Sequence, residues 1–179
     1  LRSPARLVAA MKRELSGPEW CARYPTSRTT ASLVEPFQSN VERFITALER
    51  AGCKVVIAAT RRPVERAWLM RQAWDIVHGL VRPEHVDERR DIPIQWEHHS
   101  HEASIAAAKA MVDTYRLVVR PSLTSRHIEG RAVDMSIRRP KSFESIDGAG
   151  RRVVVSTEAE LYALGASYGV TKLVSDRPH

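Results

Sequence analysis

Two stretches of the sequence contain residue types that can bind a divalent metal ion and activate water. The first is in the middle of the chain and contains His127 and Asp134; the second is at its end and contains Asp176 and His179. Two imidazoles and one carboxylate are zinc ligands, and three protein ligands leave the fourth position open, as in catalytic sites. The remaining carboxylate, Asp176, is a candidate general base. The sequence therefore predicts a zinc hydrolase.

The spacing of the central residues fits this chemistry. If a strand begins near Gly130, then Gly130, Ala132 and Asp134 share one face, and the two small residues leave room beside the carboxylate. Gly130 can adopt a positive φ, which would let the chain bend and bring His127 back toward Asp134. Ser125 is predicted to form a hydrogen bond near this turn and to orient the histidine.

The spacing at the end of the chain supports a paired role for the last two candidates. Asp176 and His179 are three residues apart, and this spacing points two side chains in the same direction on a helix or turn. If His179 binds zinc, Asp176 would therefore be within reach of the attacking water. Pro178, between them, would stiffen the segment.

These residues resemble the signature of the LAS-type zinc peptidases, which include D-alanyl-D-alanine carboxypeptidases and dipeptidases and the L-alanyl-D-glutamate endopeptidases of phage lysins. The signature is Ser-x-His-x-x-Gly-x-Ala-x-Asp, followed far downstream by Glu or Asp-x-x-His. The matching residues are Ser125, His127, Gly130, Ala132 and Asp134 in the first part, and Asp176 and His179 in the second.

The resemblance implies a role for each matched residue. The zinc ligands would be His127, Asp134 and His179. Asp176 would be the general base, and an aspartate here resembles the endopeptidase branch more than the dipeptidase branch. Arg61, which follows a predicted strand and precedes Pro63, would steady the substrate carbonyl or the oxyanion, although Arg62 could serve instead.

The function implied is zinc-dependent hydrolysis of peptide bonds in peptidoglycan stem peptides, as an L-Ala-D-Glu-type endopeptidase with Zn²⁺ as its cofactor. Two alternatives stay open: a D-Ala-D-Ala carboxypeptidase, and a non-catalytic binding module stabilised by zinc. The expected place of action is the bacterial cell wall, in the periplasm or outside the cell. No signal-peptide pattern is visible, so a phage lysin and a secreted toxin are both compatible with the sequence.

Composition narrows the choice of partner. The formal net charge of +7 indicates affinity for an anionic partner such as a wall polymer. The basic residues are scattered, whereas nucleic-acid-binding proteins usually concentrate them, so a nucleic-acid-binding domain is the less favoured interpretation. No apolar run approaches the roughly 18 residues of a membrane span. We expect a monomer.

The hydrophobic pattern predicts an α+β fold in which helices flank a small antiparallel or mixed sheet that carries the zinc site. A length of 179 residues suits one domain, 1–179, with an N-terminal helix and loop over 1–31 and the family-like region over 36–179. Loops are expected over 17–31 and 82–101. Helices are predicted over 4–15, 36–51, 63–79, 103–115 and 157–168, and strands over 53–60, 132–137, 151–155 and 170–174.

Two further groups of reactive residues have simpler interpretations. Cys21 and Cys53 lack the spacing of metal ligands and are expected to be buried thiols rather than a disulfide. The stretch 97–102 contains three histidines, but the His-Glu-x-x-His motif fails because Ile105 occupies its last position. This stretch is expected to line a cleft or to be a solvated loop.

Overall fold

The computed structural model describes residues 12–173, and the chain divides into two compact units. Unit 1 comprises the described residues up to Pro25 together with Pro63–Leu123, and unit 2 comprises Thr26–Arg62 together with the residues from Thr124 onward. Each unit has its own hydrophobic core. The described residues form four α-helices and three sheets of two strands each, which confirms the α+β class.

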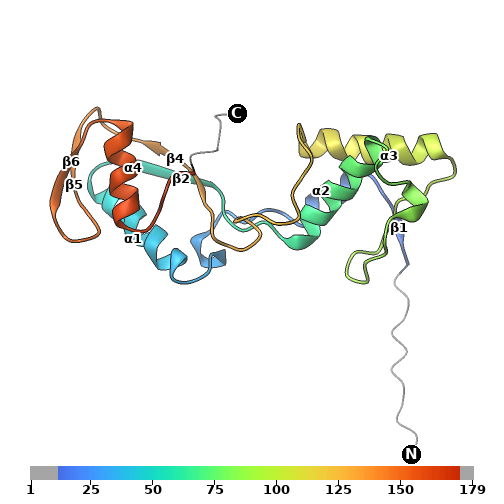
Figure 1. Ribbon diagram of the computed structural model, residues 1–179, viewed down its shortest axis with the longest axis horizontal. Helices are drawn as coiled ribbons and strands as arrows, with labels where there is room; N and C mark the ends of the chain where they lie inside the picture. Colours follow the sequence, from blue (N-terminus) through green and yellow to red (C-terminus); the bar gives the residue numbers. More distant parts are fainter. Residues whose placement is uncertain (1–11, 174–179) are drawn as a thin grey trace, which may run out of the picture. The chain divides into compact units, whose positions relative to one another are not determined.

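Unit 1 is built around two helices that pack against each other, α2 (Val64–Val77) and α3 (His101–Tyr115) (Figure 1). Both were predicted, over 63–79 and 103–115, and α3 begins two residues earlier than expected. Gly79 has a φ of +67° just beyond α2, and the Ser100 hydroxyl accepts a hydrogen bond from the Ala103 amide at the start of α3. The core between them contains side chains from both helices and from the short 3-10 helix η1 (Pro18–Ala22): Trp20, Leu69, Ala73, Ala108 and Met111.

The connecting segments of unit 1 are more ordered than loops of their composition would suggest. In the segment 82–101, the 3-10 helix η3 (Pro83–His85) is followed by β3 (Ile94–Gln95), which pairs in parallel with β1 (Glu14–Leu15). The helix predicted over 4–15 is therefore wrong for residues 12–15, because the Glu14 amide donates to the Pro93 carbonyl in this ladder. The rest of that prediction lies outside the described residues.

The described part of unit 2 packs two helices and four strands around one core. Its elements are α1 (Phe37–Arg50), β2 (Lys54–Ala59), β4 (Asp134–Arg138), β5 (Phe143–Ile146), β6 (Arg152–Val155) and α4 (Glu158–Ser167). Strand β2 pairs antiparallel with β4, and β5 pairs antiparallel with β6. Helix α1 contacts β2 and β5, and α4 contacts β6 (Figure 1). The core between them consists mainly of large apolar side chains: Phe44, Leu48, Phe143, Val155, Leu161 and Leu164.

The helices of unit 2 follow the prediction closely, but the strands do not. The Thr157 hydroxyl accepts from the Glu160 amide while the Glu160 carboxylate accepts from the Thr157 amide, which forms a capping box at the start of α4. Strand β5 was not predicted. The strand over 53–60 was expected to be buried, yet β2 alternates between exposed and half-buried residues because a two-stranded sheet has one face in solvent. Within 170–173 no strand forms, and residue 174 lies outside the described range.

Two further predictions, on the cysteines and on membrane-spanning helices, can be compared with the structure. Cys21 in unit 1 and Cys53 in unit 2 are buried free thiols, as expected, and burial raises the pKa of each. None of the described helices is both long and apolar enough to cross a membrane.

Candidate metal centre

The structure brings two of the predicted zinc ligands together in unit 2. His127 Nε2 lies 3.3 Å from Asp134 Oδ1. His127 belongs to a turn over 126–130, and Asp134 is the first residue of β4. Gly130 ends the turn with a φ of +72°, and its amide donates to the His127 carbonyl. The chain therefore folds back as predicted, although the strand begins at Asp134 rather than near Gly130.

The ring of His127 is oriented by a backbone carbonyl at the end of β2. Nδ1 lies 2.5 Å from the Thr60 carbonyl oxygen. A carbonyl can only accept, so Nδ1 carries the proton, and in the neutral ring Nε2 presents its lone pair toward Asp134. Metal-binding histidines commonly donate their second N–H to a carbonyl in this way, which fixes both tautomer and orientation.

Thr60 is itself fixed by the segment 26–34, so its carbonyl offers a rigid support. The side chain of Thr60 is fully buried, and its hydroxyl donates to the Thr29 carbonyl at 3.1 Å and contacts the Ser32 hydroxyl at 2.9 Å. The Thr60 amide donates to the Ser27 carbonyl at 2.8 Å. Just before it, the register of β2 on β4 shifts at Ala58, a bulge of the kind that bends a strand and redirects its end.

The same segment also contacts the turn that carries His127. The Val34 amide donates to the Gly130 carbonyl at 3.1 Å. A Cβ at Gly130 would lie 3.3 Å from the Ser32 carbonyl oxygen and 3.3 Å from Val34 Cγ1. Position 130 therefore requires glycine both for its positive φ and for the close approach of the 26–34 segment.

The two ligands perturb each other's protonation. The hydrogen bond with Asp134 raises the pKa of His127, against the effect of partial burial, and the Thr60 carbonyl adds to this rise. The hydrogen bond with His127 lowers the pKa of Asp134, helped by the charges of Arg62 and Lys172. Without a metal, the contact is favourable when the ring is protonated. A divalent cation would replace that proton.

The separation of the two donor atoms fits a shared zinc ion. Bonds of about 2.1 Å at a tetrahedral angle place two donors about 3.4 Å apart, close to the 3.3 Å between His127 Nε2 and Asp134 Oδ1. The Asp134 side chain is 57% exposed, so its remaining lone pairs are accessible. Donor types, spacing and the fixed tautomer therefore all suit zinc.

The other predicted ligand and the predicted base, His179 and Asp176, lie outside the described residues. Within 12–173, no three side chains of His, Cys, Asp or Glu are grouped so that they could bind a metal ion. That range contains only the first two of the three predicted ligands.

The two arginines after β2 differ in their relation to the site. Arg61 is exposed, and its carbonyl accepts from the Ser27 amide. Arg62 is half-buried, its amide donates to the His127 carbonyl, and its charge lowers the pKa of both His127 and Asp134. Of the two candidates for an oxyanion-stabilising role, Arg62 is therefore the one whose charge acts on both ligands.

Ser125 forms a hydrogen bond in the turn, as predicted, but the contact that orients the His127 ring comes from Thr60. Its hydroxyl accepts from the Ile128 amide at 3.3 Å, and its carbonyl accepts from the Glu129 amide. Ser125 thus stabilises the turn that carries His127, while Thr60 orients the imidazole. Thr60, its partners in the 26–34 segment and Lys172 were missed by sequence reasoning, because nothing in their local pattern marks contacts between segments distant in the chain.

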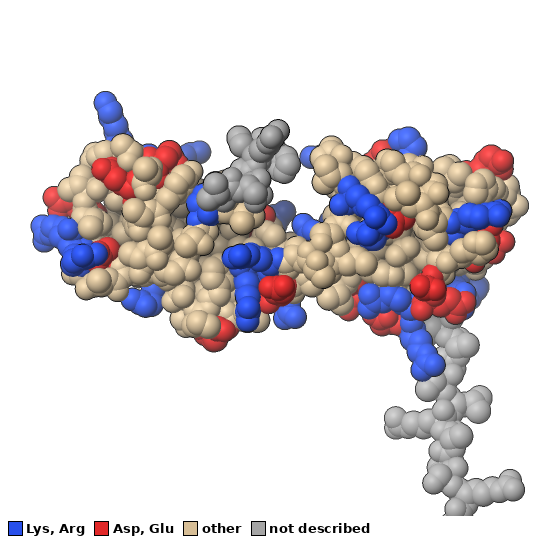
Figure 2. Space-filling model, viewed as in Figure 1, with Lys and Arg blue, Asp and Glu red and all other residues tan. Residues whose placement is uncertain are grey.

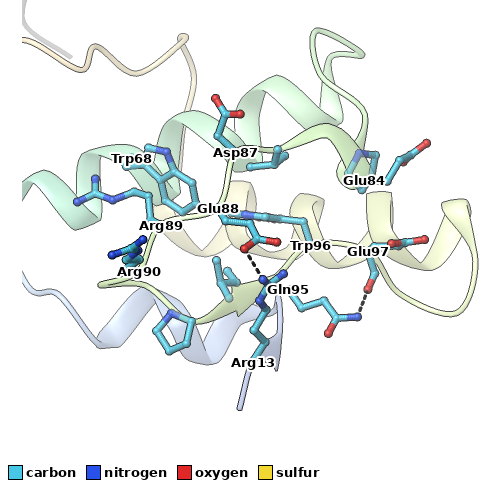
Figure 3. A pocket seen from close by; sticks show the side chains of 14 residues that line it. Arg13, Trp68, Glu84, Asp87, Glu88, Arg89, Arg90, Gln95, Trp96 and Glu97 are labelled. Carbon is cyan, nitrogen blue, oxygen red and sulfur yellow. Dashed lines mark hydrogen bonds and ion pairs between the residues drawn. The ribbon is translucent and has the colours of Figure 1, made fainter. Parts of the chain in front are cut away.

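Two pockets, one in each unit, are lined by none of the predicted site residues. A pocket of about 700 Å³ in unit 1 is lined by Trp68, Trp96 and several charged side chains (Figure 3). The indole N–H of Trp96 is buried and has no acceptor among the described residues. In unit 2, a hollow of about 860 Å³ lies between α1 and the β5–β6 hairpin.

The three histidines of the stretch 97–102 lie away from the candidate metal ligands in the sequence and belong to the other unit. They belong to unit 1, where His98 makes a hydrogen bond of 3.0 Å with the Ser16 hydroxyl and is half-buried, while His99 and His101 are exposed. The interpretation as a solvated loop holds for His99, whereas His101 is exposed but is the first residue of α3.

Comparisons with known proteins add no relative from which a role could be transferred. The chain matches no family model, no curated protein and no solved structure. The surface gives one further observation: on the face shown in Figure 2, Lys and Arg side chains are interspersed with Asp and Glu. The functional assignment therefore depends on the chemistry of the residues themselves.

Proposed function

We propose that this protein is a zinc-dependent peptidase that hydrolyses peptide bonds in peptidoglycan stem peptides, as an endopeptidase of the L-Ala-D-Glu type. The observation that carries the proposal is the 3.3 Å separation of His127 Nε2 and Asp134 Oδ1, with Nδ1 of the same ring bonded to the Thr60 carbonyl. An imidazole and a carboxylate arranged in this way are two adjacent ligands of a tetrahedral cation. The matching signature residues supply the substrate class.

In this mechanism His127, Asp134 and His179 would bind the zinc ion. Bound zinc would supply a Lewis acid for the substrate carbonyl and would lower the pKa of water. Asp176 would accept a proton from the attacking water and give it to the departing amine. These roles for Asp176 and His179 follow from the sequence pattern alone.

The positive charge beside the ligands would stabilise the negative charge that develops on the substrate. Arg61 was predicted for this role, and Arg62 is the alternative that the electrostatics of the site favour, since its charge already acts on both ligands. A guanidinium aimed at the developing oxyanion contributes most when it is partly shielded from water, and Arg62 is half-buried whereas Arg61 is exposed.

The proposal is tested by the products released from purified sacculi. The zinc-loaded wild type should release new amino groups, and mass spectrometry should find fragments cut between L-Ala and D-Glu. His127→Ala and Asp176→Asn should each lower the rate by at least about 100-fold, because one removes a ligand and the other the base. His99→Ala, an exposed histidine in unit 1, is the matched control and should retain the wild-type rate.

Each competing function has its own result. Release of free D-Ala alone would identify the carboxypeptidase. Tight zinc binding that is lost in His127→Ala, together with no cleavage of any stem peptide, would identify a zinc-stabilised binding module. Wild-type cleavage by His127→Ala would contradict the metal-centre proposal altogether.

A further inference from the structure

The β2–β4 pair has one face on the core of unit 2 and one face open to solvent. Val55, Met135 and Ile137 pack against the core. The opposite, exposed residues form a surface that we call the open face: Lys54, Val56 and Ala58 on β2, and Asp134, Ser136 and Arg138 on β4. The candidate metal ligand Asp134 is therefore one end of a continuous surface across two strands.

The far end of the open face carries two positive charges directly opposite each other. The register pairs Lys54 with Arg138. Like charges in directly opposed positions of a sheet repel and are destabilising. Both side chains are exposed, and neither forms an ion pair within the described part of the chain. A bound carboxylate would remove the repulsion and satisfy both cations.

Between the two ends, the open face carries small, uncharged side chains. Val56 is 54% exposed, and it pairs with Ser136 across the strands. Ala58, the bulged residue, lies next to the pair formed by Ala59 and Asp134. An extended peptide with small side chains could lie over this stretch, covering Val56 without a steric clash.

We propose that the open face binds the C-terminal part of the peptide substrate, with the terminal carboxylate of the peptide between Lys54 and Arg138. This inference rests on the proposed function for the nature of the substrate. Its occupant is an extended peptide with small side chains and a free C-terminal carboxylate. The charges are complementary, and the apolar stretch between the cations and Asp134 suits alanine-rich peptides.

The length of the open face selects among substrates. Arg138 is four positions after Asp134 on β4, which is about 13 Å at about 3.3 Å per residue. An extended peptide spans this distance with about four residues. A carboxypeptidase substrate has its carboxylate one residue beyond the cleaved bond, about 4 Å away, which is too short. The cation pair therefore favours an endopeptidase that cuts several residues before the C-terminus.

The test measures peptide affinity apart from cleavage. The zinc-loaded Asp176→Asn protein is titrated with a stem pentapeptide that ends in a free carboxylate, and with the same peptide ending in an amide. The acid should bind about 10-fold more tightly than the amide, as expected for charge-assisted contacts. In the Lys54→Gln, Arg138→Gln double variant this preference should disappear. The control, Arg50→Gln with Lys141→Gln, removes two exposed cations of unit 2 outside the open face and should keep the preference.

The possible results separate this proposal from the catalytic one. A preference for the acid that depends on Lys54 and Arg138 supports the open face as a peptide site, even if the wild type cleaves no stem peptide. Equal affinity for acid and amide overturns it, even if the wild type is an active endopeptidase. If the double substitution weakens binding of a DNA duplex and leaves peptide affinity unchanged, the cations serve nucleic acid and the proposal is likewise overturned.

Discussion

Asp75 in unit 1 and Asp134 in unit 2 are both carboxylates bonded to basic side chains, but they differ in how completely they are satisfied. The Asp75 side chain is 11% exposed and accepts hydrogen bonds from both Arg71 and Arg120 at 2.8–3.0 Å. The Asp134 side chain is 57% exposed, and within residues 12–173 its one ion pair is with His127, at 3.3 Å. A buried carboxylate whose oxygens all accept hydrogen bonds stabilises a fold. An exposed carboxylate with fewer hydrogen bonds keeps lone pairs that a cation can use.

The two pairs also differ in what they connect. Arg71 and Asp75 are one turn apart on α2, Arg120 follows α3, and Arg71 also donates to the Pro121 carbonyl. Asp75 therefore joins the segment after α3 to the face of α2. His127 and Asp134 join a turn to the start of β4, and the positions of both are set by backbone contacts with the 26–34 segment and the end of β2.

The largest effect should come from removing the charge of Asp75. Asp75→Asn leaves Arg71 partly buried beside a neutral amide, so we expect the free energy of unfolding to fall by about 2–3 kcal/mol, below the full cost of breaking a buried pair because Arg120 remains half-exposed. Urea unfolding measures the loss. The control is Asp113→Asn, which breaks the exposed Lys109–Asp113 pair on α3 and should cost less than about 0.5 kcal/mol.

The zinc affinity of the same variant tests the separation of roles. If the Asp75 pair is purely structural, folded Asp75→Asn should bind zinc as tightly as the wild type, as measured by calorimetry. A large loss of zinc affinity would show that the two carboxylates do not have separate roles.

A middle-sized effect is expected from substituting the glycine that positions His127. Gly130→Ala should lower the free energy of unfolding by about 2 kcal/mol, since it combines a positive φ with contacts at 3.3 Å. Gly150→Ala shares the positive φ but has open space around its Cβ, so it should cost about 1 kcal/mol. Only Gly130→Ala should also weaken zinc binding. Equal losses in both variants would show that the close approach of the 26–34 segment contributes nothing.

The smallest effect should be the change in the free energy of unfolding of the zinc-free protein with pH. Burial tends to raise the pKa of Asp75, but hydrogen bonds from Arg120 and Arg71 lower it below its ordinary value. The contribution of Asp75 to stability is therefore present near neutral pH and is lost as the pH falls through the lowered pKa. The hydrogen bond with Asp134 raises the pKa of His127. The contribution of this contact to stability is therefore fully present below about pH 6.5 and is lost as the pH rises through the raised pKa.

Unfolding measured between about pH 3 and pH 9 in a chelator resolves these opposite signs. The stability difference between wild type and Asp75→Asn should shrink only toward acid. The difference between wild type and Asp134→Asn should shrink toward both ends, since Asp134 is protonated in acid and His127 loses its proton in base. A difference for Asp134→Asn that stays constant above pH 6.5 would contradict the perturbed pKa of His127.

The sequence predicts helices better than strands here, for physical reasons. The ends of α2 and α4 are set by local signals, Pro63 and Gly79 in one and the capping box at Thr157 in the other, and both helices form where expected. Two-stranded sheets depend on pairing between distant residues. Strand β5 was therefore missed, and the short β1 was taken for part of a helix because its partner β3 is about 80 residues away.

For the site, the sequence suggests candidate ligands but not the contacts that support them. His127 and Asp134 are visible because their chemistry and spacing are distinctive, and the positive φ of Gly130 follows from the bend they require. The supporting contact is a backbone carbonyl, that of Thr60, and any residue type supplies a carbonyl. Neighbouring residues of the same type, Arg61 and Arg62, likewise look alike in the sequence, and only the folded chain shows that Arg61 is exposed and Arg62 half-buried.

The hydrogen bonds of the 26–34 segment have a consequence for how this centre could be tuned. The segment contacts Thr60 through Ser27, Thr29 and Ser32, and Gly130 through Val34. Substitutions there would tilt the imidazole without touching either ligand. Metal preference and turnover could thus diverge between variants that have the same coordinating atoms, and a search for the determinants of activity should begin in this stretch, some 100 residues before the histidine it controls.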